Sequence, residues 1–220
     1  MDEPRAAPPG DPEMLSSDDS AELRVELRDG AAVIVRPIRP TDREAIRGAF
    51  ARLSERSRYQ RFMTAITALS ESQLDYLTEV DHHDHEALVA FDAVAGEGVG
   101  VGRFVRLADG TSAEAAVTVI DDWQGRGLGT ALCNLLAERA RDEGIARFTA
   151  LLLAENDQMH DVLASLGPAK VLSRDSGTVV VEVAIPERGI GDHMAGVLRV
   201  VAGGTVELAT PPWGLREAGD

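Results

Sequence analysis

A glycine-rich turn is the segment that most constrains how this chain can fold. Residues 115–120 form a short apolar run, and residues 128–136 place leucine and alanine side chains on one face of a helix. Gly125, Gly127 and Gly129 lie between the two. A strand that passes through a tight turn into a helix gathers unpaired backbone N–H groups, and such a point binds phosphate. The pattern therefore predicts an α/β fold with a phosphate site at this bend.

Three kinds of phosphate loop combine a strand, a turn and a helix. A Walker A loop requires a lysine that reaches the terminal phosphates, and this turn has none. A dinucleotide loop follows G-x-G-x-x-G; here Thr130 takes the third small position, and Glu155 follows the next apolar run. Such a domain should continue with several strand–helix units, whereas only one more helix pattern follows. The third kind is Gln124-x-x-Gly127-x-Gly129.

This third pattern resembles the Q/R-x-x-G-x-G/A signature of the GNAT family of N-acetyltransferases. The order of elements from about residue 36 to residue 185 is similar to a whole GNAT domain. Residues 53–62 and 113–124 resemble bacterial protein-lysine acetyltransferases that modify acyl-CoA synthetases. The resemblance implies an α/β GNAT fold, with a mixed, mainly antiparallel central sheet, a splayed strand pair and helices on both faces.

The resemblance also implies acetyl-CoA as co-substrate. Its pyrophosphate is expected at the turn, bound by backbone N–H groups and by the charge of Arg126. The strand before the turn is expected to bind the pantetheine arm, and one of its N–H groups to polarise the thioester carbonyl. Asn156 has two interpretations, a cofactor contact or a helix N-cap. The predicted cofactor-binding residues are Val117, Thr118, Val119, Gln124, Gly125, Arg126, Gly127, Leu128, Gly129, Thr130 and Asn156.

A catalytic base is the second requirement for acetyl transfer to an amine. A lysine amine has a pKa of about 10.4 and is neutral in only roughly one molecule in a few thousand at pH 7. In the lysine-acetyltransferase group a glutamate at the start of this strand is the base, which makes Glu114 the catalytic candidate. Partial burial would raise the pKa of a glutamate and suit it to this task. The tyrosine acid of many family members has no counterpart, because Leu163 takes its position.

The predicted function is direct transfer of an acetyl group from acetyl-CoA to a primary amine. The favoured acceptor is a lysine side chain on a protein such as an acyl-CoA synthetase. A small amine or an antibiotic is an alternative acceptor, and a non-catalytic acyl-CoA-binding regulatory protein is an alternative class. Cys133 lies in a helix pattern without a paired base and is expected to be packed. His82, His83 and His85 point in different directions and lack further ligands, so no metal site is predicted.

The composition narrows the choice of partners and compartment. The formal net charge is −15, which argues against nucleic acid and anionic membranes and suits a cationic acceptor. No apolar run is long enough to cross a bilayer, and the single cysteine fits a reducing cytoplasm. We expect a disordered acidic leader over residues 1–20, the GNAT domain over 21–186, and a C-terminal extension of unknown role over 187–220. The sequence leaves the oligomeric state open.

Local patterns predict the remaining elements. Residues 23–27 and 32–35 flank a turn and predict a hairpin. Two capping boxes, Thr41 with Glu44 and Ser70 with Gln73, predict two helix starts. Strands are predicted over residues 86–91, 100–107, 113–120 and 148–153, a helix that ends at Gly144, another helix near 159–166, and a closing strand pair at 171–172 and 178–185.

Overall fold

The computed structural model describes residues 22–187 of the 220-residue chain. The leader expected over residues 1–20 and, apart from residue 187, the extension expected over 187–220 lie outside the described residues. The described part forms one eight-stranded sheet in the order β1-β2-β3-β4-β5-β6-β8-β7. All neighbouring strands are antiparallel except β5 and β6. The sheet is therefore mixed and mainly antiparallel, as expected.

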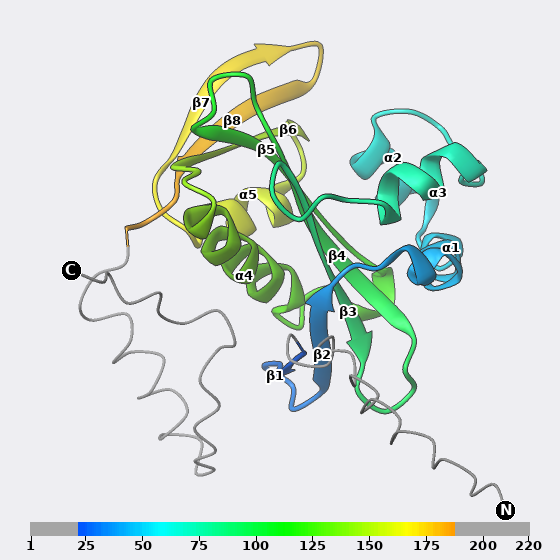
Figure 1. Ribbon diagram of the computed structural model, residues 1–220. Helices are drawn as coiled ribbons and strands as arrows, with labels where there is room; N and C mark the ends of the chain where they lie inside the picture. The colour runs from blue at the N-terminus through cyan, green and yellow to red at the C-terminus, as the bar shows by residue number, and fades with distance from the viewer. Residues whose placement is uncertain (1–21, 188–220) are drawn as a thin grey trace, which may run out of the picture.

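The helices and strands follow the predicted order along the chain, except that the helix α2 was not predicted (Figure 1). The elements are β1 (Leu23–Glu26), β2 (Ala32–Pro37), η2 (Pro40–Asp42), α1 (Arg43–Ala51), α2 (Glu55–Phe62), α3 (Glu71–Thr78), β3 (His85–Asp92), β4 (Gly98–Arg106), β5 (Ser112–Val119), η3 (Asp121–Trp123), α4 (Leu128–Asp142), β6 (Arg147–Leu153), α5 (Asp157–Ala164), β7 (Ala169–Asp175) and β8 (Thr178–Ala184).

One of the two predicted capping boxes forms and the other does not. The Ser70 side chain accepts the Gln73 N–H, and the Gln73 side chain accepts the Ser70 N–H, so α3 begins as predicted. The prediction at Thr41 is wrong. α1 begins one residue later, after the 3₁₀ turn η2, and its N-cap is Asp42. Thr41 lies inside this turn and so cannot cap α1, and the buried Asp42 carboxylate makes no cap bond but accepts hydrogen bonds from both terminal guanidinium nitrogens of Arg36 at 2.8 and 2.7 Å.

The helices form two layers on opposite faces of the sheet. α4 packs on β3, β4 and β5, with α5 beside it, and α1, α2 and α3 lie on the other face (Figure 1). Glycines on β4 let α4 come close. A Cβ at Gly100 would lie 3.1 Å from Leu132 Cδ1 and 3.2 Å from Leu128 Cδ2. This close packing fixes the first turns of α4, and with them the glycine-rich turn, against the middle of the sheet.

The parallel pair β5 and β6 separates soon after it begins. Its register covers only three positions, from Ser112 opposite Arg147 to Glu114 opposite Thr149. β5 continues to Val119 and β6 to Leu153 without further pairing between them. The two strands therefore open into a gap toward the glycine-rich turn, which is the splayed pair that the resemblance implied.

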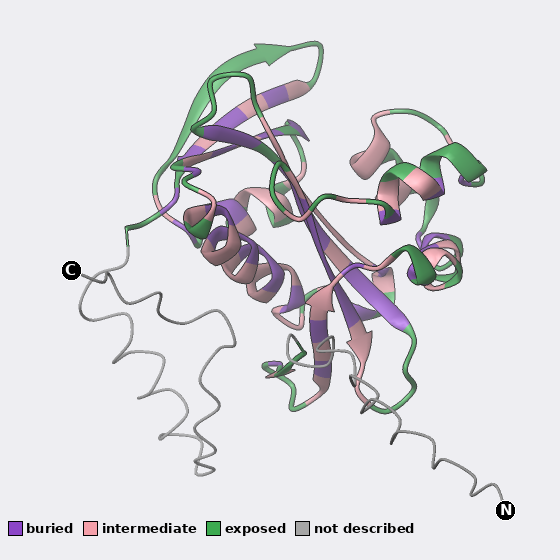
Figure 2. Cartoon of the chain, viewed as in Figure 1, coloured by how far each residue is buried: buried purple, intermediate pink, exposed green. Residues whose placement is uncertain are grey.

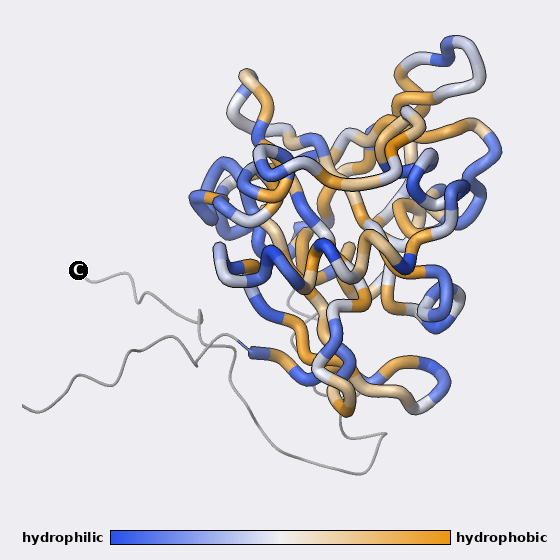
Figure 3. The backbone as a smooth tube through the Cα atoms, turned by 90° about the vertical axis from the view of Figure 1, so that its right-hand side faces the viewer, coloured by the Kyte–Doolittle hydropathy of each residue, from blue (hydrophilic) through white to orange (hydrophobic). Residues whose placement is uncertain are grey.

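The core lies between the sheet and the two helix layers. Buried residues line the central strands and the sheet-facing side of α4, whereas β7 is exposed along its whole length (Figure 2). Phe104 and Phe148 stack across the sheet at 6.1 Å between ring centroids. Hydrophilic stretches gather on the outer helices and turns (Figure 3). Within residues 22–187, no helix combines the length and the apolar character needed to span a membrane.

Candidate active site

A cleft of about 530 Å³ occupies the gap between β5 and β6. This volume lies within the range of small-molecule and cofactor sites. Its walls come from β5, from the glycine-rich turn and the start of α4, from the end of β6, from α5 and from α2. The lining includes Ser57, Gln60, Arg61, Glu114, Val117, Thr118, Val119, Gln124, Gly125, Gly127, Gly129, Thr130, Leu151, Asn156, Gln158 and Asp161.

The glycine-rich turn presents a group of unused backbone donors. Gly125 and Gly127 have φ of 74° and 94°, a left-handed conformation that glycine adopts without strain. The first backbone bond of α4 runs from the Ala131 N–H to the Gly127 carbonyl. Among the described residues, no acceptor binds the N–H groups of residues 125–130. These donors coincide with the positive end of the helix dipole, so the turn has the geometry of an anion site.

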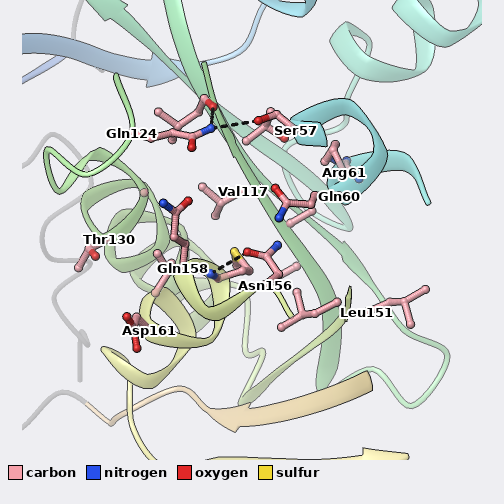
Figure 4. A pocket seen from close by; sticks show the side chains of 18 of the residues that line it. Ser57, Gln60, Arg61, Val117, Gln124, Thr130, Leu151, Asn156, Gln158 and Asp161 are labelled. Atoms are coloured by element: carbon pink, nitrogen blue, oxygen red, sulfur yellow. Dashed lines mark hydrogen bonds between the residues drawn. The ribbon is translucent and has the colours of Figure 1, made fainter. Parts of the chain in front are cut away.

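Gln124 lines the cleft, but its side-chain amide is engaged with the protein. Its Nε2 donates to the Val119 carbonyl at 3.0 Å and to Ser57 Oγ at 3.3 Å (Figure 4). The neighbouring Asp121 carboxylate accepts the Ser54 N–H and the hydroxyls of Ser54 and Ser57. Burial alone would raise the pKa of Asp121, and these hydrogen bonds outweigh burial and leave that pKa lowered. Gln124 and Asp121 thus attach α2 to the end of β5.

Two residues of the predicted cofactor site have side chains that do not line the cleft. Arg126 was expected to reach the phosphate, but its guanidinium lies over the Trp123 ring at 4.8 Å and pairs with Asp29 at 3.4 Å. Leu128 was included for its backbone, and its side chain is buried in the core. Neither residue lines the cleft. A carboxylate and an aromatic ring thus engage the Arg126 side chain in this structure, and its contact with the phosphate stays a prediction.

The three residues of β5 that are predicted to contact pantetheine differ in the direction of their backbone groups. The Ile120 N–H donates to Val99 of the β4 side, and the Val119 carbonyl points the other way, to Gln124. Backbone groups of successive residues in a strand alternate between its two edges. The backbone N–H and C=O groups of Thr118 therefore face β4. The N–H and C=O groups of Val117 and the N–H group of Val119 face the gap. All three residues line the cleft.

Asn156 is a helix N-cap that also borders the cleft. Its side-chain oxygen accepts the Met159 N–H at 3.2 Å, which confirms the capping interpretation. Figure 4 shows Asn156 and Gln158 beside Val117, across the gap from Gln60. The α5 start thus contributes amide groups to the wall opposite α2.

Glu114 lies where β5 and β6 part, and it lines the cleft. Its side chain faces the same side of the sheet as Ala116 and Thr118, toward α2. It is exposed, so the partial burial that would suit a base is not found. Arg61 of α2 lies in the same wall. Burial lowers the pKa of Arg61, and the charge of Glu114 acts against this lowering.

Neither a tyrosine nor a cysteine lines the described walls of the cleft. Tyr59 and Tyr76 do not line it, and Leu163 is buried, consistent with the lack of a tyrosine acid. Cys133 is 1% exposed, and burial raises the pKa of its thiol to about 12, which confirms the expected packed cysteine.

The three histidines each have their own partner. His82 Nδ1 is 2.7 Å from the buried Glu86, His83 Nδ1 contacts Glu143, and His85 Nε2 is 3.2 Å from Arg103. Within residues 22–187, no group of three or more histidine, cysteine or acidic side chains is arranged to hold a metal.

Several residues that line the cleft were not among the predicted site residues. Ser57, Gln60 and Arg61 come from α2, and Arg28 comes from the turn between β1 and β2. The spacing of the arginines in α2 gives no sign that Arg61 turns inward, and nothing local indicates that the distant hairpin meets the glycine-rich turn.

The fold and the cleft together define a GNAT-type acetyltransferase domain. The mixed sheet has one parallel pair, so a doubly wound dinucleotide-binding domain is excluded. The model of the Acetyltransferase (GNAT) family matches residues 51–167. The chain therefore belongs to this family of acyltransferases, whose co-substrate is acetyl-CoA.

Individual relatives support the assignment. The chain is 35% identical over 157 residues to Acetyltransferase PA5475 of Pseudomonas aeruginosa, covering 70% of this chain and 84% of that protein. It is 36% identical over 165 residues to Acetyltransferase Pat of Mycolicibacterium smegmatis, covering 74% and 49%. It thus spans about half the length of that Pat protein. The crystal structure of the GNAT domain of S. lividans PAT is similar with a TM-score of 0.69 and 33% identity, covering 74% of this chain and 96% of that one.

Proposed function

We propose that this chain transfers an acetyl group from acetyl-CoA to the side-chain amine of a protein lysine. The transfer is direct, within a complex that holds donor and acceptor together. The observation that carries the proposal is the row of unused N–H groups at residues 125–130, placed at the mouth of a gap that has the size of a cofactor. An acyl-CoA needs both an anion site and a channel for its pantetheine arm. In this cleft the unused N–H groups would be the anion site, and the gap between β5 and β6 would be the channel.

The roles of the cleft residues follow from their positions. The N–H groups of residues 125–130 bind the diphosphate, with α4 adding the positive end of its dipole. Val117 and Val119 use their free edge to pair with the amides of the pantetheine arm. This arrangement directs the thioester toward Glu114, where an N–H group of β5 polarises the carbonyl.

Glu114 is proposed as the base that takes the proton from the attacking ammonium. Three observations support this role: the carboxylate lines the cleft, it lies where the strands part, and it faces α2 rather than α4. Its exposure favours proton transfer through a water molecule, because an incoming lysine and solvent reach it from the same side. The leaving thiolate needs no acid, since a thiol has a pKa of about 8.5.

A protein acceptor is favoured by charge and by resemblance. A chain with a net charge of −15 attracts a basic protein face at long range. The M. smegmatis relative bears the name Acetyltransferase Pat, and the sequence resembles enzymes that modify acyl-CoA synthetases. We therefore propose an acyl-CoA synthetase as the acceptor.

The test is transfer of label from radioactive acetyl-CoA to purified acyl-CoA synthetases, with small amines and an aminoglycoside as competing acceptors. Lys170 is the single lysine of the sequence, so Lys170→Arg removes background from self-labelling. In this background, Glu114→Gln should slow transfer about 100-fold or more. Glu155→Gln is the matched control, because Glu155 is exposed and does not line the cleft.

Each alternative predicts a different result. Label that reaches only the small amines would refute the protein acceptor. Binding of acetyl-CoA without transfer to any acceptor would identify a regulatory acyl-CoA-binding protein. Equal rates for Glu114→Gln and its control would remove Glu114 from the role of base and leave the rest of the proposal intact.

A further inference from the structure

The turn of the β1–β2 hairpin is attached to the glycine-rich turn. The Arg28 N–H donates to the Arg126 carbonyl at 3.2 Å. Asp29, the next residue, pairs with the Arg126 guanidinium at 3.4 Å. A backbone hydrogen bond and an ion pair, made by consecutive residues, thus fix the position of the hairpin relative to the glycine-rich turn.

This attachment places the Arg28 side chain over Gly127. A Cβ built on Gly127 would lie 3.3 Å from Arg28 Nε and 3.4 Å from its Cγ and Cδ. The guanidinium group therefore lies against a bare backbone, next to the N–H groups that have no acceptor. Arg28 also lines the cleft.

The positively charged Arg28 side chain has no counter-ion among the described residues. Its side chain is exposed, and within residues 22–187 it has no hydrogen-bond or ion-pair partner. The other arginine of the turn, Arg126, is engaged by Asp29 and by the Trp123 ring. Arg61, the second arginine in the cleft lining, lies near Glu114 at the opposite end.

A diphosphate at this turn requires more than backbone donors. Coenzyme A is a polyanion, and the chain itself carries a net charge of −15, so the long-range field opposes binding. A guanidinium group offers a planar set of donors that matches phosphate oxygens. Arg28 is the cleft arginine placed at the phosphate end.

We propose that Arg28 is a ligand of the coenzyme A diphosphate, supplied by a hairpin outside the glycine-rich turn. The assignment rests on the proposed function, since it assumes that an acyl-CoA binds in the cleft. The hairpin precedes residues 51–167, which the family model matches. Arg28 thus reaches the phosphate site from outside that range, and the lack of a side chain at Gly127 leaves room for the arginine stem.

Calorimetric titration with acetyl-CoA tests the assignment on the full chain. Arg28→Met keeps the aliphatic stem and the backbone N–H and removes the charge, and it should weaken binding about 10- to 100-fold. Arg28→Lys keeps the charge without the planar donors and should recover part of the loss. Arg24→Met is the matched control: Arg24 is exposed on β1 of the same hairpin, does not line the cleft, and should bind within about twofold of wild type.

The same titration with dephospho-CoA, which lacks the 3′-phosphate, identifies the group that Arg28 contacts. If Arg28 binds the diphosphate, Arg28→Met loses the same factor for both ligands. A loss that disappears with dephospho-CoA would overturn the assignment in favour of the 3′-phosphate. Wild-type affinity in Arg28→Met, or an equal loss in Arg24→Met, would also refute it while leaving the proposed function standing. Failure of the wild type to bind acetyl-CoA would refute the proposed function itself.

Discussion

Replacing Gly127 by alanine adds a single methyl group to the proposed phosphate site and so tests that site. Gly127 has a φ of 94°, and an alanine there must adopt a left-handed conformation that costs about 1–2 kcal/mol. For a domain of this size that cost lowers the melting temperature by about 2–8 °C. The new methyl group would also lie 3.3 Å from Arg28 Nε, closer than an ordinary contact, so the arginine must move.

Two other glycines separate backbone strain from loss of binding. Gly110 has a φ of 73° with nothing within 4 Å of a built Cβ, and it lies in the β4–β5 turn and does not line the cleft. Gly125 has a φ of 74° and the same open surroundings, but it belongs to the glycine-rich turn. We expect all three alanine variants to lose similar stability, and only those at positions 125 and 127 to lose affinity for acetyl-CoA.

The assay is unfolding in the presence and absence of acetyl-CoA at about 100 times the wild-type Kd. At that concentration the ligand stabilises the native wild type by about 2.7 kcal/mol. A tenfold weaker site would retain about half of this stabilisation. Acetyl-CoA should stabilise the Gly110→Ala variant as much as it stabilises the wild type. If Gly127→Ala also kept it while losing only stability, the glycine-rich turn would not be the phosphate site.

Two further predictions concern groups outside the cleft. Burial alone would raise the pKa of Glu86, but its hydrogen bond with His82 and the charge of Arg139 leave it lowered, and the bond to Glu86 raises the pKa of His82. The Glu86 contribution to stability is therefore lost as pH falls through its lowered pKa, and the His82 contribution as pH rises through its raised pKa. Glu86→Gln should remove both pH dependences and lower the free energy of unfolding by about 1.5–3 kcal/mol near neutral pH, measured by urea titration; unchanged pH profiles would contradict this. Because Cys133 is buried with a pKa of about 12, the native protein should resist alkylation and react once denatured, and steady labelling of the native protein would be the contrary result.

The sequence predicted most of the elements because their signals are local. The alternating and apolar runs of the strands, the Ser70 capping box and the left-handed Gly144 after α4 each depend on residues a few positions apart. The same holds for the glycine-rich turn, whose φ values and free N–H groups follow from Gly125 and Gly127 themselves. Resemblance to a family then supplied the mixed, mainly antiparallel sheet and its splayed strand pair.

The sequence did not predict which partners several side chains contact in the folded structure. Thr41 did not cap α1 because it lies inside the 3₁₀ turn η2, and the helix begins after that turn. Arg126 did not face the cleft because Asp29 and Trp123 bind its side chain. No local sequence pattern predicts which of several possible partners a charged side chain will contact.

The sequence by itself determined the bend that gathers backbone donors, since backbone conformation at glycine depends on the residue and its nearest neighbours. Only the tertiary structure decided what surrounds that bend: the gap left when β6 departs from β5, the inward turn of Arg61, and the hairpin that lays Arg28 over Gly127. Those features arise from packing between segments far apart in the chain, where shape and charge across the whole domain select one arrangement.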